Sequence, residues 1–187
     1  MRQLGSTALK RLNRSWRRRL SHRLGLVLQG VQSPYNVGAI VRTAAALGVD
    51  ELYLSGPTAA PRHANAQRVA MGTDRYLSVE TFDDATAAIV QARSSGYQVV
   101  ALELADEATP IQDYALGADV CIVVGNEDHG LSVAHLGACD AAVYIPQFGK
   151  VGSLNVSAAV AIACYEVRRQ QVGSTIQIVP PRAAPEL

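Results

Sequence analysis

The segment QSPYNVGAIVR holds two polar residues, Asn36 and Arg42, whose types and spacing could do chemistry. Asn36 could cap a helix that begins there, because its side chain can accept from backbone N–H groups. Helical side chains lean toward the N-terminus, so Arg42 would reach back over Gly38 and Ala39, near the positive end of the helix dipole. A phosphate bound there would satisfy both the guanidinium and the helix end. The alternative is that Arg42 points to solvent and Asn36 is only a cap.

The segment GNEDHG, residues 125–130, directly follows the most apolar stretch of the chain. Its two terminal glycines permit close backbone approach, and Glu127 stands where a strand end would present it to a ligand. Turns commonly use Gly, Asn and Asp, so the pattern alone is not specific. His129 could act as a general base, but a lone loop histidine is more often a surface residue, and we do not count it as catalytic.

The segment IPQFGKVGSLNVSAAVAIACYE, residues 145–166, places two glycines before Ser153 and Asn155. Either of these residues could cap the long alanine-rich helix that follows. The loop is therefore either an ordinary entry into a core helix or a set of backbone N–H groups that hold the polar edge of a ligand.

Several common kinds of site have no counterpart in this sequence. No segment fits a GxGxxG fingerprint, a P-loop or a GxSxG elbow. The three cysteines, Cys121, Cys139 and Cys164, lack zinc-ligand spacing. They are typical of small buried hydrophobic residues in a reducing compartment, so neither a disulfide nor a metal site is expected.

Apolar stretches that alternate with amphipathic ones must position these three loops. The pattern predicts an α/β fold, a parallel sheet with helices on both faces. The expected strands are 24–28, 51–54, 98–102, 119–124 and 142–145, and the expected helices are 36–47, 83–94, a short one after Ser132, and 156–171. The segment GPTAAPRHANA is predicted to be a loop and the end of the chain a mobile tail.

The length of 187 residues fits one domain, and 49% hydrophobic residues exclude a disordered chain. No apolar run is long enough to span a bilayer, which takes about 18 residues. The formal net charge of +1 hides two unlike parts: residues 1–23 carry eight basic and no acidic side chains, and residues 24–187 carry nine basic and sixteen acidic ones. This asymmetry suggests a partner for the basic arm.

The arm has an apolar residue every four positions, which is typical of an amphipathic helix. The stripe is Leu4, Ala8, Leu12, Trp16 and Leu20. Three interpretations stay open: a nucleic-acid-binding arm, a mitochondrial transit peptide, or a surface helix packed by its stripe. Under the first, the phosphate-binding residues are Arg11, Arg14, Arg17, Arg18 and Arg19. The expected location is cytoplasmic, or mitochondrial if the arm is a transit peptide.

Taken in order, the three segments resemble the motifs of the SPOUT superfamily of RNA methyltransferases, in its TrmH-like (SpoU) branch. NVGAIVR, VVGNEDHGLS and IPQFGKVGSLNVSAAVA correspond to the first, second and third motifs, and MGTDRYLSVE resembles the segment before the family's middle helix. The resemblance covers about residues 24–172. Gln147 departs from the usual Met at a position without a functional role.

The resemblance implies a deep trefoil knot in the C-terminal part of the sheet, and a homodimer whose active site uses both subunits. It divides the chain into a basic helical extension (1–23), a methyltransferase domain (24–172) and a flexible tail (173–187). It also implies that S-adenosylmethionine is bound, largely by backbone groups, around Leu102, Gly125, Ile145 and Leu154.

The implied reaction is methyl transfer to a ribose 2′-OH of RNA. Arg42 would orient and activate the hydroxyl group, Asn36 and Glu127 would hold Arg42, and Ser153 and Asn155 would position the third loop and the substrate. The expected substrate is transfer RNA, at a D-loop guanosine, since a separate N-terminal RNA-binding domain is lacking. The alternatives are ribosomal RNA, or a non-catalytic RNA-binding protein of this fold.

Overall fold

The computed structural model of the chain describes residues 3–116 and 118–173. Within this part, seven strands form one sheet in the order β3-β2-β1-β6-β4-β7-β5, and all paired neighbours are parallel. The strands are β1 (Leu24–Gln29), β2 (Glu51–Ser55), β3 (Ser78–Phe82), β4 (Gln98–Leu102), β5 (Thr109–Pro110), β6 (Val120–Val124) and β7 (Ala141–Tyr144). The predicted parallel sheet is confirmed.

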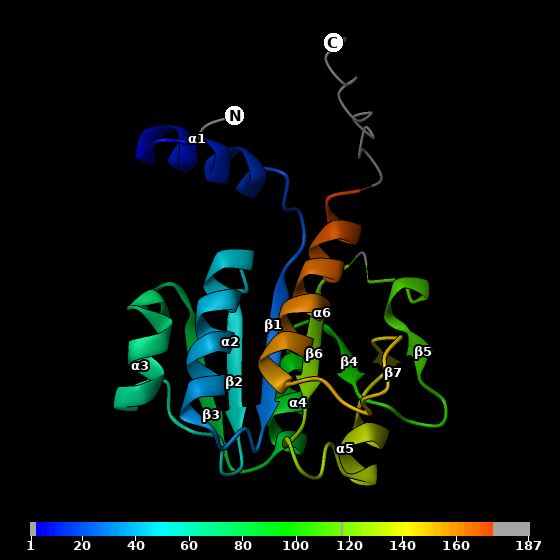
Figure 1. The fold of residues 1–187 in the computed structure, drawn as a ribbon. Coiled ribbons are helices and arrows are strands. Elements are labelled where there is room, and N and C mark those ends of the chain that lie inside the picture. Colours follow the sequence, from blue (N-terminus) through cyan, green and yellow to red (C-terminus); the bar gives the residue numbers. More distant parts are fainter. Residues whose placement is uncertain (1–2, 117, 174–187) are drawn as a thin grey trace.

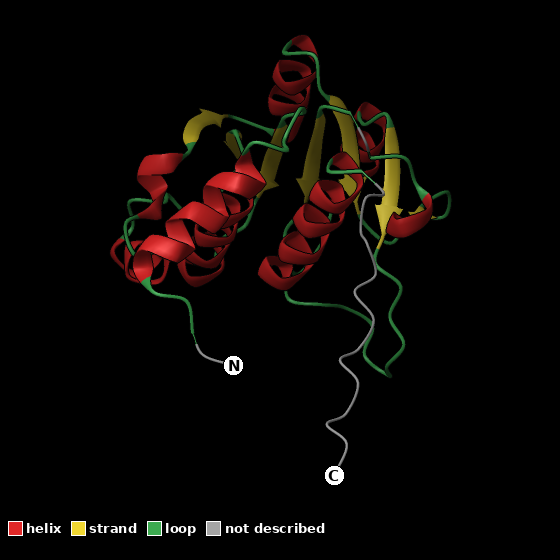
Figure 2. Ribbon diagram, turned by 90° about the horizontal axis from the view of Figure 1, so that it is seen from above, coloured by secondary structure: helices red, strands yellow, loops and turns green. Residues whose placement is uncertain are grey.

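Helices cover both faces of this sheet, also as predicted (Figure 1 and Figure 2). The helices are α1 (Ser6–Arg17), α2 (Pro34–Leu47), α3 (Ala64–Ala70), α4 (Ala85–Ser94), α5 (Val133–Ala138) and α6 (Val156–Gln171), with short 3-10 turns η1 (Thr73–Tyr76) and η2 (Ile111–Asp113). Helices α2 and α6 pack on one face, and α4 packs with α5 on the other.

The central strands are apolar on both sides because both sides are buried. In β6, Ile122 belongs to the core layer under α2 and α6, whereas Cys121 and Val123 belong to the layer under α4. In β1, Leu26 and Val27 divide in the same way. A strand buried on both faces has a continuous apolar sequence, which is why β6 could be predicted.

Three local expectations were wrong. Helix α2 begins at Pro34 with Ser33 as its N-cap, so Asn36 lies inside the first turn and does not cap it. Proline at the first helical position and a preceding serine make a start signal that was overlooked. Helix α3 begins within the segment predicted as a loop, and the edge strand β3 was missed because its side chains are mostly exposed.

Helix α3 is fixed closely against α2 at Gly38. A Cβ atom added at Gly38 would lie 2.4 Å from the carbonyl oxygen of Ala66, which is backbone of α3 and cannot move aside. The face of α2 at Gly38 is therefore occupied by α3, and a phosphate at this helix end stays a prediction.

The arm helix α1 stands away from the sheet and has no buried residue (Figure 1). Its apolar stripe is exposed, with Leu4 at 57% and Trp16 at 51% exposure. The interpretation of a surface helix packed by its stripe is thus wrong for the single chain. Where the arm joins the sheet, Arg168 of α6 donates to the carbonyl oxygens of His22 at 2.8 Å and Leu47 at 2.9 Å.

Two further expectations concern membrane-spanning helices and the end of the chain. Among residues 3–116 and 118–173, no helix combines the length and the apolar character needed to cross a membrane. Of the tail predicted at 173–187, residues 174–187 lie outside the described part of the chain. The three-part division of the chain stays a prediction.

Candidate active site

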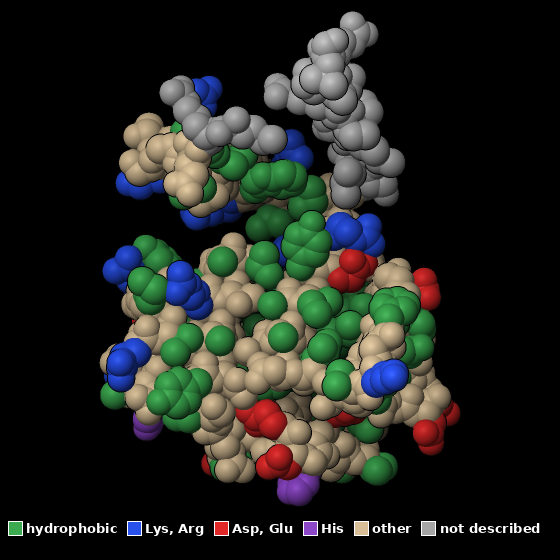
Figure 3. Space-filling view, in the orientation of Figure 1, with side chains coloured by type: hydrophobic (Ala, Val, Ile, Leu, Met, Phe, Trp, Pro, Cys, Tyr) green, Lys and Arg blue, Asp and Glu red, His purple; other side chains and the backbone are tan. Residues whose placement is uncertain are grey.

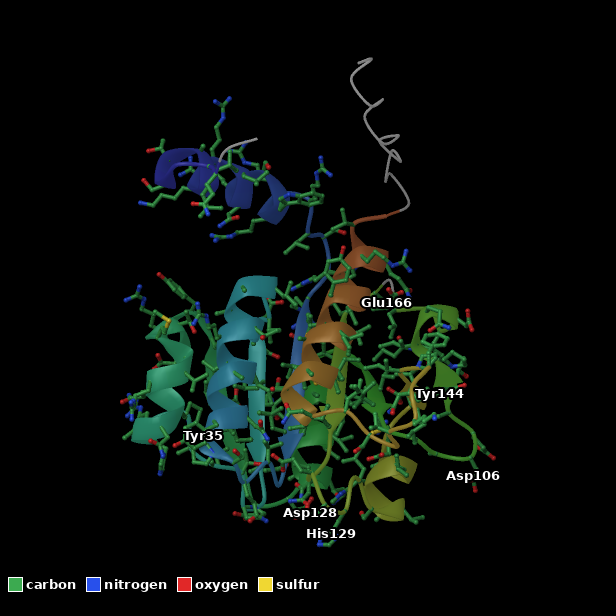
Figure 4. All side chains as sticks on the ribbon, viewed as in Figure 1. Tyr35, Asp106, Asp128, His129, Tyr144 and Glu166 are labelled. Carbon is green, nitrogen blue, oxygen red and sulfur yellow. The ribbon has the colours of Figure 1, made fainter. Side chains whose placement is uncertain are left out.

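A cavity of about 350 Å³ lies at the carboxyl ends of β4, β6 and β7, beside the start of α6. This is the edge at which an open parallel sheet binds ligands. Leu102, Gly125, Ile145 and Leu154, the four predicted cofactor contacts, all line it. Figure 4 shows Asp128 and His129 at this end of the molecule and Glu166 at the opposite end of α6.

The loop after β6 forms one wall of the cavity and is closed too tightly for a side chain at its first position. A Cβ atom on Gly125 would lie 2.3 Å from the carbonyl carbon of Gly130 and 2.6 Å from the nitrogen of Leu131. The amide of Asn126 donates to the carbonyl oxygen of Gly30 at 2.8 Å, which ties the loop to the end of β1. The wall therefore depends on glycine and on a cross-sheet hydrogen bond.

A chain of hydrogen bonds joins one residue from each of the three motifs. The Nδ2 of Asn155 donates to the Oδ1 of Asn36 at 3.1 Å, and the Nδ2 of Asn36 donates to the Oε1 of Glu127 at 2.7 Å. Asn155 also caps α6, since its Oδ1 accepts from the backbone nitrogen of Ser157 at 3.0 Å. Three of the five predicted catalytic residues thus lie together.

Arg42 does not join this chain. Its Nη1 donates to the Sδ of Met71 at 2.8 Å, and the expectation that Asn36 and Glu127 hold Arg42 is not met within the single chain. Six helical residues turn through about 600°, so Asn36 and Arg42 face different directions on α2. Met71 ends α3 at a φ of 54°, which residues other than glycine seldom adopt.

The remaining candidates are placed as follows. Ser153 lines the cavity from the third loop and is exposed, and it does not cap α6. His129 lines the cavity and is also exposed. Both side chains are accessible to a bound molecule. Neither takes part in the hydrogen bonds that join Asn36, Glu127 and Asn155.

Glu103 is a cavity residue that we did not predict. Its Oε2 accepts from the backbone nitrogen of Leu131 at 3.0 Å, so it holds the far end of the Gly125–Gly130 wall. The signal was available, because Glu103 is the first residue after a predicted strand, where ligands bind in such sheets.

The cysteines offer no nucleophile. Burial raises the pKa of Cys139 to about 11 and that of Cys164 to about 12, and it raises the pKa of Cys121 well above its usual value. All three stay protonated near neutral pH, where a thiol is a weak nucleophile. In the described part of the chain, no three His, Cys, Asp or Glu side chains gather in a way that could hold a metal ion.

Comparison with known proteins gives this geometry a context. A model of the SpoU rRNA Methylase family matches residues 23–165. The 23S rRNA (guanosine-2'-O-)-methyltransferase RlmB of Acinetobacter baylyi is 36% identical over 149 residues, 79% of this chain and 60% of that protein. The tRNA (guanosine(18)-2'-O)-methyltransferase of Escherichia coli is 31% identical over 163 residues, 87% of this chain and 70% of that protein.

Solved structures agree with the sequence comparison. The AdoMet-bound rRNA methyltransferase of Sinorhizobium meliloti has a TM-score of 0.73 and 31% identity, over 79% of this chain and 56% of that one. This chain thus spans less than two thirds of that protein and of the Acinetobacter enzyme. The family match covers most of the chain and includes all three motifs, so the chain belongs to the SpoU rRNA Methylase family.

Proposed function

We propose that this protein is an S-adenosylmethionine-dependent RNA methyltransferase that modifies a ribose 2′-OH. The observation that carries the proposal is the cavity at the strand ends, which adjoins the hydrogen-bonded chain of Asn36, Glu127 and Asn155. The names of the Acinetobacter and Escherichia relatives, both guanosine 2′-O-methyltransferases, support the reaction type. The AdoMet-bound Sinorhizobium structure supports the cofactor.

The cavity fits this cofactor in size and lining. Its volume of about 350 Å³ lies within the range of small-molecule sites. Leu102, Ile145 and Leu154 supply apolar surface for a purine ring, and Gly125 lets backbone groups approach its polar edge. Gln147 also lines the cavity, and its Oε1 is buried with no hydrogen-bond partner in the described residues. When bound, the cofactor supplies a methyl group activated by its attachment to a sulfonium.

The side chains then act by positioning. A guanidinium has five donors and no acceptor, so the role we assign to Arg42 is to donate to the ribose hydroxyl and to the neighbouring phosphate. Asn36 and Glu127 shape the place where the ribose enters, and Ser153 and Asn155 position the third loop. Holding the reacting atoms in line can account for much of the barrier reduction in such a transfer.

We further propose that two copies of the chain form the active site, with Arg42 of the partner subunit serving the cavity. This arrangement accounts for an arginine that lies apart from Asn36 and Glu127 in its own chain. Large apolar side chains are exposed along the third loop, α6 and the start of α2, on the face that Figure 3 shows. They are Tyr35, Phe148, Val151, Leu154, Ile162 and Tyr165.

The proposed fold includes a deep trefoil knot formed by the segment from β7 through α6. The support is the family membership and the path of the chain, since β7 lies between β4 and β5 whereas α6 packs in the core layer of β6. The loop at Gly125 and the segment between β7 and α6 line the same cavity, so the two segments that would form the knot lie next to each other.

The proposed substrate is transfer RNA, at a D-loop guanosine. The similarity to the Escherichia tRNA enzyme extends over 87% of this chain, against 79% for the Acinetobacter rRNA enzyme. The test is methylation of total RNA by the purified protein with labelled cofactor, followed by nucleoside analysis of separated RNAs. We expect 2′-O-methylguanosine in the tRNA fraction. Label confined to rRNA would favour the ribosomal alternative, and RNA binding without label would favour a non-catalytic protein.

The basic arm is the proposed grip on the RNA backbone. Its five predicted phosphate-binding arginines are exposed and take part in no salt bridge among the described residues; they are Arg11, Arg14, Arg17, Arg18 and Arg19. We expect removal of residues 1–20 to weaken RNA binding, because the protein loses side chains that neutralise RNA phosphates. The slope of log K against log salt concentration should also decrease, by about 0.7–0.9 for each phosphate that is no longer neutralised. This truncation spares His22 and Arg23, which are bonded to the sheet domain.

Cofactor affinity should stay the same in the truncated protein, because α1 contributes nothing to the cavity lining. Filter binding at several salt concentrations measures the slope for the two proteins. A slope equal to that of the full-length chain would refute the arm's role.

A further inference from the structure

The basic side chains of the sheet domain are unevenly distributed. Between residues 24 and 173 there are eight, and three of them lie within salt-bridge distance of an acid: Arg93 near Asp140, Arg168 near Asp50 and Arg169 near Glu166. The other five have no salt bridge within the described residues. They are Arg42, Arg62, Arg68, Arg75 and Lys150. Four of these five belong to α2, to α3 with the residues before it, and to η1.

This side of the molecule is also poor in acids. Residues 56–77 contain three arginines and a single acid, Asp74. Three acids lie instead at the ends of β4 and β6, where they line the cavity: Glu103, Glu127 and Asp128. Figure 3 shows basic side chains along the α3 side of the domain, below the arm, and acidic ones at its lower end. Arginines that outnumber the acids of their segment and form no salt bridge create a local positive potential that attracts phosphates.

The helix α3 is packed closely against the helix that carries Arg42. The close approach of Gly38 to Ala66 fixes α3 on α2, and the contact between Met71 and the Arg42 guanidinium links α3 directly to that side chain. A polyanion that binds along α3 would therefore be led toward Arg42 in a defined register, and not toward a mobile loop.

An exposed aromatic ring adds a second recognition element. Tyr76 is 64% exposed, and the guanidinium of Arg75 lies 4.8 Å from its ring centre and donates to its hydroxyl oxygen at 2.9 Å. Arginine and tyrosine planes are the groups on which proteins stack unpaired RNA bases. A paired arginine and tyrosine at the surface fits RNA better than it fits an acidic peptide.

We propose that Arg62, Arg68, Arg75 and Tyr76, here called the α3 flank, form a second RNA-binding surface, separate from the arm. The flank binds the phosphates of the substrate next to the modified nucleotide and directs the backbone to Arg42. The inference rests on the proposed function in that the bound polyanion is the RNA substrate of the same site.

The test is the triple variant Arg62→Gln, Arg68→Gln, Arg75→Gln in the full-length protein. Because all three side chains are exposed, the cofactor affinity and the melting temperature should stay at the wild-type values. RNA affinity should fall about 10- to 100-fold at low salt, and the salt slope should decrease by about 2 if each arginine neutralises one phosphate. KM for RNA should rise by a factor similar to the fall in affinity.

Two matched variants sharpen the result. Arg169→Gln removes the same charge from an exposed position on α6 that is paired with Glu166, and it should change RNA affinity less than twofold. Replacing the three flank arginines with lysine keeps the charge and should restore most of the binding. If the triple glutamine variant has the RNA affinity and the salt slope of the wild type, the α3 flank does not bind RNA. That result would not affect the proposed methyl transfer function. If the wild type transfers no methyl group, the binding data still decide whether the flank contacts RNA.

Discussion

Arg42→Ala should lower kcat for methyl transfer by about 10²- to 10³-fold, the range typical of losing one hydrogen-bond donor that stabilises charge developing on the reacting oxygen. The dissociation constant for S-adenosylmethionine should not change, because Arg42 is exposed, donates to Met71 alone among the described residues and is absent from the cavity lining. Single-turnover methyl transfer and calorimetric cofactor titration measure the two quantities separately. A loss of cofactor affinity equal to the loss of rate would contradict the proposed role.

The conservative replacement Arg42→Lys is the matched control. Lysine keeps the positive charge but loses the planar fork that can donate to a hydroxyl and a phosphate together. Its rate should therefore fall between those of alanine and arginine. A lysine variant as active as the wild type would show that charge alone suffices.

Mixing two inactive variants tests whether Arg42 serves its own cavity or that of a partner. With random reassortment of Arg42→Ala and Gly125→Val chains, half of the dimers are mixed, and each mixed dimer would hold one complete site of two. Activity should then return to about a quarter of the wild-type value if the site is shared between subunits. Mixtures as inactive as their parents would place the whole site in one chain.

Gly125→Ala should reduce cofactor affinity about 5- to 150-fold, because the new methyl group would press on backbone atoms of Gly130 and Leu131 that cannot move separately. Overpacking of this kind typically costs about 1–3 kcal/mol, and here the strain falls on the cavity wall. The free energy of unfolding should fall by a similar amount. Calorimetry for the cofactor and thermal unfolding by circular dichroism measure the two effects.

Gly137→Ala provides the control for this substitution. Gly137 lies in α5, and a Cβ atom there would meet nothing within 4 Å. Replacing a helical glycine with alanine generally stabilises by up to about 1 kcal/mol, so the melting temperature should rise slightly and cofactor affinity should stay constant. Wild-type cofactor affinity in Gly125→Ala would mean that the loop after β6 does not form the binding wall.

The elements that could be predicted from the sequence are those whose burial or capping is visible in their own residues. Strand β6 is apolar along its whole length because helices cover both of its faces, and α6 is recognisable from its alanines and its cap at Asn155. Elements that depend on a neighbour were missed. Strand β3 is held by its pairing with β2 and has no burial pattern of its own, and α3 is only seven residues long.

The residues of the candidate site differ in the same way in how far the sequence predicts their positions. Asn36, Glu127 and Asn155 come together because all three lie at the carboxyl edge of the parallel sheet, Glu127 after β6 and the two asparagines at the starts of α2 and α6. The order of the motifs and the α/β topology suffice to suggest this placement. The direction of Arg42 could not be inferred, because it depends on where α3 places Met71. The close approach of Ala66 to Gly38 is likewise a contact between helices that no local pattern encodes.

The hydrogen bond from Arg168 to the carbonyl oxygen of His22 limits how far the arm can move from the sheet domain. With His22 held to α6, and α1 ending at Arg17, only residues 18–21 are left as a tether. Four residues span at most about 14 Å when fully extended. The backbone nitrogens of residues 18–20 also donate to carbonyl oxygens of α1, which shortens the connection further. When the domain binds an RNA as proposed, the arm therefore stays within a small volume around it, and so short a connection keeps the effective concentration of its arginines high. Even weak individual arginine contacts then bind most of the time, so lengthening the tether should weaken RNA retention although every arginine is still present.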